Sequence, residues 1–202
     1  MTLDGAYFER IYTANKDPWG LADRWYEQRK YALSIAALPR ERYRAALEIG
    51  CSVGVLTAAL GERCDRLLAV DVSESAVATT RGRTAHLPGV GVERRSLPGE
   101  WPEGSFDLVV LSEVGYYFAV DDLRDVLDHV CGALEPGGSL LAVHWRHPVE
   151  DYPLGGDDVH AVLDQDPRLE ATVRHVETDF LLTVYARTPP KARSVAQETG
   201  LA

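Results

Sequence analysis

The residues Leu47-Glu48-Ile49-Gly50-Cys51-Ser52-Val53-Gly54 decide the fold of this chain. The apolar run Ala45-Ala46-Leu47 leads into them and predicts a buried strand, and the run Val55–Leu60 after them has a helical pattern. A strand that turns into a helix through glycines and other small residues brings backbone N–H groups close to a ligand. We therefore expect a ligand-binding strand, turn and helix over about residues 44–63.

An acid follows this turn at an informative distance. Asp71 comes 21 residues after Gly50, at the end of a second apolar run, Arg66–Val70. In doubly wound sheets an acid at this place binds the hydroxyls of a ribose. The glycine spacing argues against a dinucleotide site, because Ser52 and Val55 stand where the GxGxxG fingerprint needs glycine.

Composition narrows the class of protein. The 202 residues are 46% hydrophobic and 26% charged, which predicts one globular domain with a sizeable core. The net charge of −10 argues against a nucleic-acid partner. Three widely spaced cysteines favour free thiols in a reducing cytoplasm over disulfides or a zinc site. With no membrane-length apolar run and no signal-peptide pattern, we expect a cytoplasmic monomer or weak homodimer and no membrane partner.

Strand and helix patterns alternate along the chain. A helical segment rich in Trp and Tyr occupies residues 1–40 and predicts a cap or lid, with a helix over 22–38 and a turn at Asp17-Pro18-Trp19. Strands are expected at 44–49, 66–70, 90–95, 106–111, 140–145, 169–176 and 179–187, with helices at 53–63, 74–84, 121–134 and 155–165. Ser73 is the expected N-cap of the 74–84 helix, and the 155–165 helix is expected to be capped near Asp157.

This order predicts an α/β protein with a mostly parallel, doubly wound, seven-stranded sheet that closes with an antiparallel hairpin. The predicted domain covers residues 1–187, with the core over 44–187. A polar tail, 188–202, follows it.

The turn resembles a known motif. Glu48-x-Gly50-x-Ser52-x-Gly54 is similar to the E/DxGxGxG motif of class I methyltransferases that use S-adenosyl-L-methionine (SAM), with Ser52 at the middle glycine. The resemblance implies a Rossmann-like methyltransferase fold. It also implies that the loop backbone packs on the methionine half of SAM and that Asp71 binds both ribose hydroxyls.

Other runs narrow the resemblance to one family. They are Asp17-Pro18-Trp19, Trp25-Tyr26-Glu27, Lys30-Tyr31, Leu38-Pro39-Arg40, Leu111-Ser112-Glu113-Val114 with Tyr116-Tyr117, and Asp151-Tyr152-Pro153-Leu154 with Asp157-Asp158-Val159-His160. Together with the glycine turn they resemble the nodulation protein S family of SAM-dependent N-methyltransferases over about residues 7–187. Named members of that family methylate the free amine of a deacetylated glucosamine in a chitooligosaccharide.

The resemblance and the expected strand ends imply a set of site residues. The expected cofactor-binding residues are Trp19, Tyr26, Arg29, Glu48, Gly50, Cys51, Ser52, Gly54, Asp71, Val72, Ser96, Leu97, Ser112 and Glu113. The expected acceptor-binding residues are Tyr116, Tyr117, Trp145, Asp151 and Tyr152. Ser96 stands where we expect an acid for the adenine amine. Gly115 stands where we expect a bulkier residue, which predicts a wider acceptor mouth.

Methyl transfer from a sulfonium needs alignment and an unprotonated nucleophile. A general base is optional for an amine and more necessary for an alcohol. Glu113 and His144 are the candidates for receiving a proton, and Tyr117 is the candidate for orienting the nucleophile. His144 also fits a structural histidine at a strand end, and Glu113 also fits a ligand for the methionine ammonium or a helix cap.

Three functions follow as alternatives. The first is N-methylation of a small-molecule acceptor, a glucosamine-like amino sugar, with SAM as cofactor. The second is O-methylation of a sugar or phenol, with His144 and Glu113 as the base. The third is SAM binding without catalysis, which Ser96 and the missing middle glycine suggest. No HxxxH or HExxH spacing supports a metal site, so no metal is expected.

Overall fold

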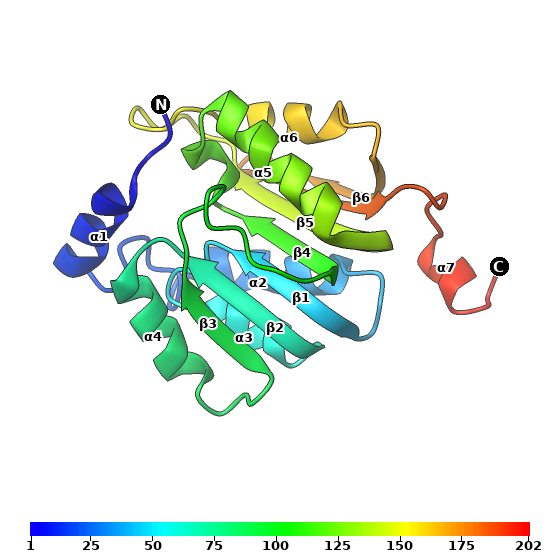
Figure 1. Cartoon of the computed structure of the whole chain (residues 1–202), viewed down its shortest axis with the longest axis horizontal. Helices are drawn as coiled ribbons and strands as arrows, with labels where there is room; N and C mark the ends of the chain where they lie inside the picture. The colour runs from blue at the N-terminus through cyan, green and yellow to red at the C-terminus, as the bar shows by residue number, and fades with distance from the viewer.

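A seven-stranded sheet forms the centre of the protein, whose computed structural model describes all residues 1–202 (Figure 1). The strand order is β3-β2-β1-β4-β5-β7-β6. The strands are β1 (Tyr43–Ile49), β2 (Cys64–Asp71), β3 (Val90–Arg94), β4 (Phe106–Ser112), β5 (Leu134–Trp145), β6 (Leu169–Val176) and β7 (Phe180–Arg187). The helices are α1 (Gly5–Ala14), α2 (Trp25–Ala37), α3 (Val55–Gly61), α4 (Glu74–Thr84), the 3₁₀ turn η1 (Gly115–Tyr117), α5 (Val120–Ala133), α6 (Gly156–Asp164) and α7 (Val195–Glu198).

Strand direction changes only at β7. The neighbours β3, β2, β1, β4 and β5 run parallel, whereas β7 is antiparallel to both β5 and β6. The prediction of a doubly wound parallel sheet with a closing antiparallel hairpin is therefore confirmed. The order reverses between β1 and β4, so a crevice forms at the carboxyl ends of these strands.

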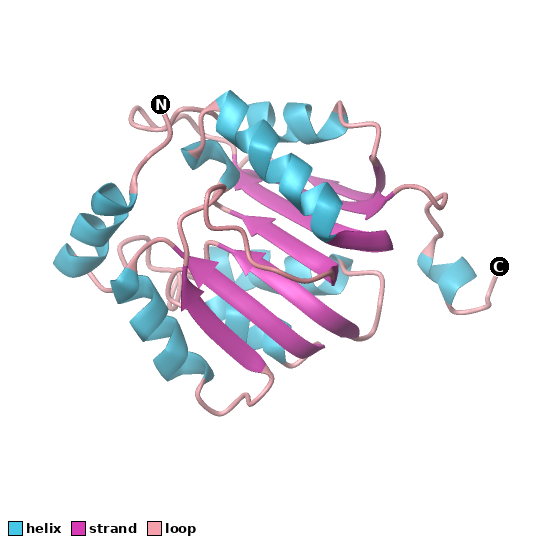
Figure 2. Ribbon diagram, in the orientation of Figure 1, coloured by secondary structure: helices cyan, strands magenta, loops and turns pink.

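Side-chain alternation divides the core between the two faces of the sheet. Leu47 and Ile49 of β1 belong to the larger hydrophobic cluster, which includes side chains of α5 and α6, whereas Ala46 belongs to the cluster that includes α3. Figure 2 shows helices on both faces of the sheet. β4 is buried along its whole length, as a central parallel strand must be.

The N-terminal segment is anchored at the carboxyl edge of the sheet. The Glu9 carboxylate of α1 accepts a hydrogen bond of 2.6 Å from Ser73 Oγ, and Tyr12 Oη donates to Ser52 Oγ at 2.6 Å. The Asp17 carboxylate accepts from the backbone N–H groups of Leu21 and Ala22, which orders the loop between α1 and α2. This loop carries Trp19 to the carboxyl ends of the strands.

Several element ends differ from the sequence analysis: α2 begins at Trp25 rather than 22, and β2 begins at Cys64 rather than 66. β5 begins at Leu134 rather than 140, because Pro136-Gly137-Gly138 lies in an irregular stretch where the pairing register with β4 shifts. The cap expected near Asp157 is made by Asp158, whose carboxylate accepts from Gly155 N–H, whereas Asp157 forms an ion pair with Arg146.

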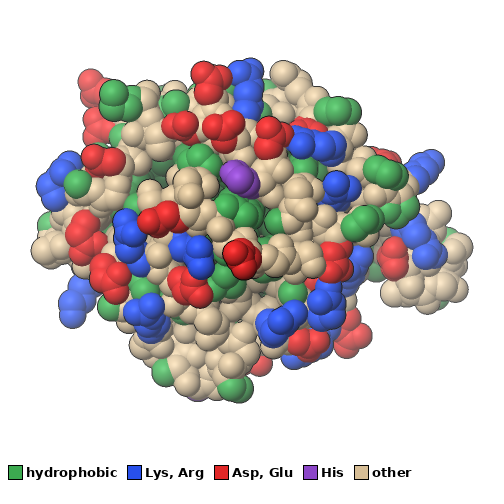
Figure 3. All heavy atoms as spheres, viewed as in Figure 1, with side chains coloured by type: hydrophobic (Ala, Val, Ile, Leu, Met, Phe, Trp, Pro, Cys, Tyr) green, Lys and Arg blue, Asp and Glu red, His purple; other side chains and the backbone are tan.

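The surface shown in Figure 3 mixes acidic and basic side chains without a large area of one sign. None of the helices combines the length and apolar character that crossing a bilayer requires. Residues 188–202 are mostly exposed and contain the short helix α7, which Figure 1 places apart from the sheet.

Candidate active site

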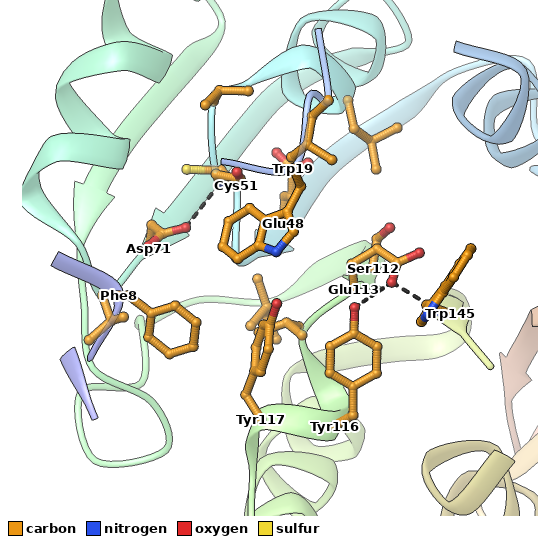
Figure 4. A pocket seen from close by; sticks show the side chains of 18 of the residues that line it. Phe8, Trp19, Glu48, Cys51, Asp71, Ser112, Glu113, Tyr116, Tyr117 and Trp145 are labelled. Atoms are coloured by element: carbon orange, nitrogen blue, oxygen red, sulfur yellow. Dashed lines mark hydrogen bonds between the residues drawn. The ribbon is translucent and has the colours of Figure 1, made fainter. Parts of the chain in front are cut away.

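A cavity of about 750 Å³ lies at the carboxyl ends of β1, β2, β4 and β5. Side chains from α1, α2, the loop between them and η1 also line it. Figure 4 shows Phe8 of α1, Trp19 of the loop, and Tyr116 and Tyr117 of η1. Crevices at this edge of a doubly wound sheet are where such folds bind ligands. The cavity is therefore the candidate site.

The turn after β1 has the backbone shape of a ligand-binding loop. Gly50 and Gly54 both have φ of +78°, and Ser52 between them has φ of +52°. A Cβ on Gly54 would lie 2.8 Å from Thr80 Cγ2, so only glycine fits there. Ser52 is fixed in its left-handed conformation because Thr80 Oγ1 donates to its carbonyl at 2.7 Å and Tyr12 donates to its hydroxyl.

Asp71 joins the end of β2 to this turn. Its carboxylate accepts from Ser52 N–H at 2.9 Å and from Ser73 N–H at 3.0 Å, with one oxygen used for each. Burial raises the pKa of Asp71, and the backbone N–H groups oppose that shift. Asp71 lines the cavity, and a carboxylate oxygen can accept more than one hydrogen bond. A buried carboxylate that can accept further hydrogen bonds fits the two hydroxyls of a ribose.

Glu48 is the second buried acid beside the turn. It lies at the end of β1, lines the cavity, and its Oε2 has no hydrogen-bond partner. Burial raises the pKa of Glu48 to about 8. A buried carboxyl group without a partner is costly unless a ligand compensates it, so this position fits a positively charged ligand group.

Glu113 is fixed by three donors at the end of β4. Its carboxylate accepts from Lys30 Nζ at 2.6 Å. It also accepts from Trp145 N–H at 3.1 Å and from Tyr116 Oη (Figure 4). Lys30 also lies 2.9 Å from Glu27 Oε2. Burial lowers the pKa of Lys30, but the two carboxylates outweigh burial and leave that pKa above its ordinary value.

His144 was a predicted proton acceptor, and the structure contradicts that role. Its side chain is fully buried and does not line the cavity. Its Nε2 accepts from Gly115 N–H at 3.1 Å, and its Nδ1 lies 3.2 Å from His160 Nε2. Burial and His160 hold the pKa of His144 well below its usual value. Because neighbouring strand residues face opposite sides, Trp145 reaches the cavity and His144 does not.

Two further predicted residues lie outside the cavity. The Arg29 guanidinium donates to the Glu177 carboxylate at 2.6 and 2.9 Å, and Asp151 is exposed on its loop. Gly115 does not widen the mouth as expected, because a Cβ there would lie 2.7 Å from His144 Nε2 and from Val159 Cγ1. Its small size makes room for the packing of His144.

The other predicted residues line the cavity together. They are Trp19, Tyr26, Glu48, Gly50, Cys51, Ser52, Gly54, Asp71, Val72, Ser96, Leu97, Ser112, Glu113, Tyr116, Tyr117, Trp145 and Tyr152. No group of three or more His, Cys, Asp or Glu side chains is arranged to hold a metal ion.

Sequence reasoning gave no role to Glu27 and Lys30, which line the cavity and form an ion-paired group with Glu113. Both occur in runs that carried the family resemblance. Their spacing of three residues on a helix is itself a signal for an ion pair. Tyr12 and Phe8 of α1, which also line the cavity, gave no such signal.

The sheet order, the closing hairpin and this cavity define a class I methyltransferase fold. The family model of Nodulation protein S (NodS) matches residues 8–152, and the chain belongs to that family. Nodulation protein S of Sinorhizobium fredii is 31% identical over 192 residues, which cover 87% of this chain and 85% of that protein. The matched regions of the Rhizobium tropici and Bradyrhizobium diazoefficiens proteins span only 55% and 52% of those proteins' lengths.

Solved structures agree with this assignment. The N-methyltransferase NodS of Bradyrhizobium japonicum, in complex with S-adenosyl-L-homocysteine (SAH), superposes with a TM-score of 0.82. It is 25% identical, and the match covers 92% of this chain and 99% of that one. A candidate methyltransferase from Pseudomonas syringae is 47% identical with a TM-score of 0.73, covering 81% of this chain and all of that one.

Proposed function

We propose that this protein is a SAM-dependent methyltransferase that acts on the free amine of a small-molecule acceptor, and that the acceptor is a glucosamine-like amino sugar. The main observation in its support is the hydrogen bond from Ser52 N–H to Asp71, beside a cavity that Glu48 and Glu113 also line. Membership of the NodS family and the SAH complex of a NodS relative support the cofactor. SAM supplies an activated methyl group on a sulfonium.

In this proposal the turn and its neighbours bind the cofactor. Asp71 accepts from the ribose hydroxyls, and Glu48 meets the positively charged methionine amine. Ser96 and Leu97, at the rim beyond β3, lie against the adenine. Trp19 covers the nucleoside from the loop between α1 and α2, held by an edge-on contact with Tyr12 at 5.5 Å. Each role follows from a side chain that lines the cavity.

Neither predicted proton acceptor is free to act as a general base at the cavity, which supports an amine acceptor. Glu113 is occupied by three donors, and His144 lies outside the cavity. Burial raises the pKa values of Tyr116 and Tyr117 well above their usual range, so both phenols stay protonated at neutral pH. An unprotonated amine attacks without help, whereas a hydroxyl needs a base. The site therefore favours nitrogen over oxygen.

The test is methyl transfer from labelled SAM to two matched acceptors. One is a chitooligosaccharide with a single free amine, and the other is its fully N-acetylated counterpart. We expect label only in the first, with the added mass on the deacetylated residue. Transfer to the acetylated sugar or to phenols would instead identify an O-methyltransferase. SAH binding without transfer to any acceptor would identify a non-catalytic SAM-binding protein.

A further inference from the structure

Six acidic side chains line the cavity, and most of them already have partners. They are Asp4, Glu27, Glu48, Asp71, Glu113 and Asp179. Asp4 caps α1 by accepting from Tyr7 N–H at 2.8 Å, and Asp179 lies 2.7 Å from His147 Nε2. Asp71 accepts two backbone N–H groups, and Glu113 accepts three hydrogen bonds. Glu48 Oε2 has no hydrogen-bond partner, and Glu27 has only the Lys30 ammonium, 2.9 Å from its Oε2.

Glu27 and Glu48 lie at different ends of the site. Glu48 ends β1 beside the glycine turn that we assign to the cofactor. Glu27 lies on α2, where Lys30 connects it to Glu113 at the end of β4. The neighbouring Tyr26 ring lies edge-on to Trp145 of β5, with centroids 5.6 Å apart. Glu27 is therefore on the side of the cavity formed by the ends of β4 and β5.

Glu27 is an unusual carboxylate. It is only 7% exposed; its Oε2 lies 2.9 Å from Lys30 Nζ, and no hydrogen bond is made to its Oε1. It forms an ion pair with Lys30, which it shares with Glu113. Two carboxylates and one ammonium leave the group with one excess negative charge when all three are ionised. A buried acceptor of this kind is costly unless a ligand donor completes it.

We propose that Glu27 is the acceptor-binding carboxylate of the site and that Lys30 is the positioning residue that holds it opposite Glu113. This inference rests on the proposed N-methyltransferase function. Glu27 accepts an N–H bond from the acceptor's amine and stabilises the positive charge that grows on the nitrogen. The nitrogen lone pair forms the new N–C bond, the C–S bond breaks with its electron pair going to sulfur, and the methylated ammonium later releases a proton to water.

Glu27→Gln tests this role, because glutamine keeps the size of the side chain but removes its charge. Glu177→Gln is the matched control, since Glu177 pairs with Arg29 outside the cavity. For each variant, calorimetry measures SAH affinity. It then measures the affinity of the SAH complex for the free-amine oligosaccharide and for its N-acetylated counterpart. Methyl-transfer assays add kcat and KM for the acceptor.

We expect Glu27→Gln to remove the preference for the free amine and to lower kcat/KM by about 10- to 100-fold, because a hydrogen bond to a charged group is lost. SAH affinity should stay within about two-fold of wild type. Glu177→Gln should match wild type in every measurement. Glu27→Asp keeps the charge but moves it back by one methylene, and it should also raise the KM for the acceptor.

Three results would overturn the inference. If Glu27→Gln weakens SAH binding and leaves the amine preference intact, the carboxylate serves the cofactor. If wild type methylates the free amine and both Glu27 variants keep its kcat/KM, only the role of Glu27 fails. If wild type methylates no amine at all, the proposed function fails and this inference fails with it.

Discussion

Replacing His144 with leucine tests whether this histidine is structural or catalytic. The His144 side chain accepts from the buried Gly115 N–H through Nε2, so its proton lies on Nδ1 and is donated to His160 Nε2. His160 Nδ1 in turn lies 3.2 Å from Thr183 Oγ1. Leucine fills the same space with an apolar side chain but leaves Gly115 N–H and His160 Nε2 without partners.

The size of the effect follows from those two groups. A buried polar group that loses its partner costs about 1–3 kcal/mol, so His144→Leu should lower the free energy of unfolding by about 2–6 kcal/mol. For a chain of this length each kcal/mol corresponds to about 2–4 °C, so the melting temperature should fall by about 4–24 °C. His144→Gln, which can present an acceptor near the position of Nε2, should lose less.

Urea unfolding and the pH profile of methyl transfer distinguish the two roles. We expect His144→Leu to lose stability, while the shape of its pH–rate profile below the melting temperature stays that of wild type. SAH affinity should also be unchanged, since His144 does not line the cavity. A variant as stable as wild type that loses an ionisation from its pH profile would refute the reasoning and restore His144 as a base.

Three further outcomes follow from buried groups. Burial lowers the pKa of His160 to about 4, so as the pH falls this histidine is protonated in the unfolded chain before it is protonated in the folded one. The contribution of His160 to the free energy of unfolding should therefore be full above about pH 6.5 and fall by on the order of 3 kcal/mol towards pH 4. Urea unfolding at several pH values measures this, and a His160→Gln variant whose free energy of unfolding falls equally steeply with pH would contradict it. Because burial raises the pKa of Glu48 to about 8, SAH binding near pH 7 should release up to one proton. Calorimetry in buffers of different ionisation enthalpy measures that release, which Glu48→Gln should abolish. Gly115→Ala places a Cβ 2.7 Å from His144 Nε2 and Val159 Cγ1 and should lower the free energy of unfolding by about 1–3 kcal/mol. An unchanged melting temperature would disprove the tight packing.

The fold followed from sequence because its signals are local. The continuous apolar run of β4, the alternation along β6 and the glycine turn after β1 each specify one element without help from distant residues. The start of β5 was missed because Pro136-Gly137-Gly138 has the composition of a loop, whereas its backbone lies in a stretch of shifted pairing with β4. Pairing of this kind depends on the partner strand.

The site was predictable where strand ends alone bring residues together. Ser52 and Asp71 meet because β1 and β2 are neighbouring parallel strands that end at the same edge. The contact between Lys30 and Glu113 joins residues 83 positions apart, and no local pattern shows it. His144 and Trp145 were both plausible at the end of β5, and only the register of the strand decides which one faces the cavity.

The pairing of Asp71 with the glycine turn is the central claim, and titration of SAH into the wild-type chain and an Asp71→Asn variant tests it most directly. We predict saturable binding to one site per wild-type chain. Because one carboxylate bond to a hydroxyl is worth about 1.5–3 kcal/mol, Asp71→Asn should bind about 10- to 100-fold more weakly. No heat of binding to wild type at millimolar SAH, or equal affinity in the two proteins, would contradict the account.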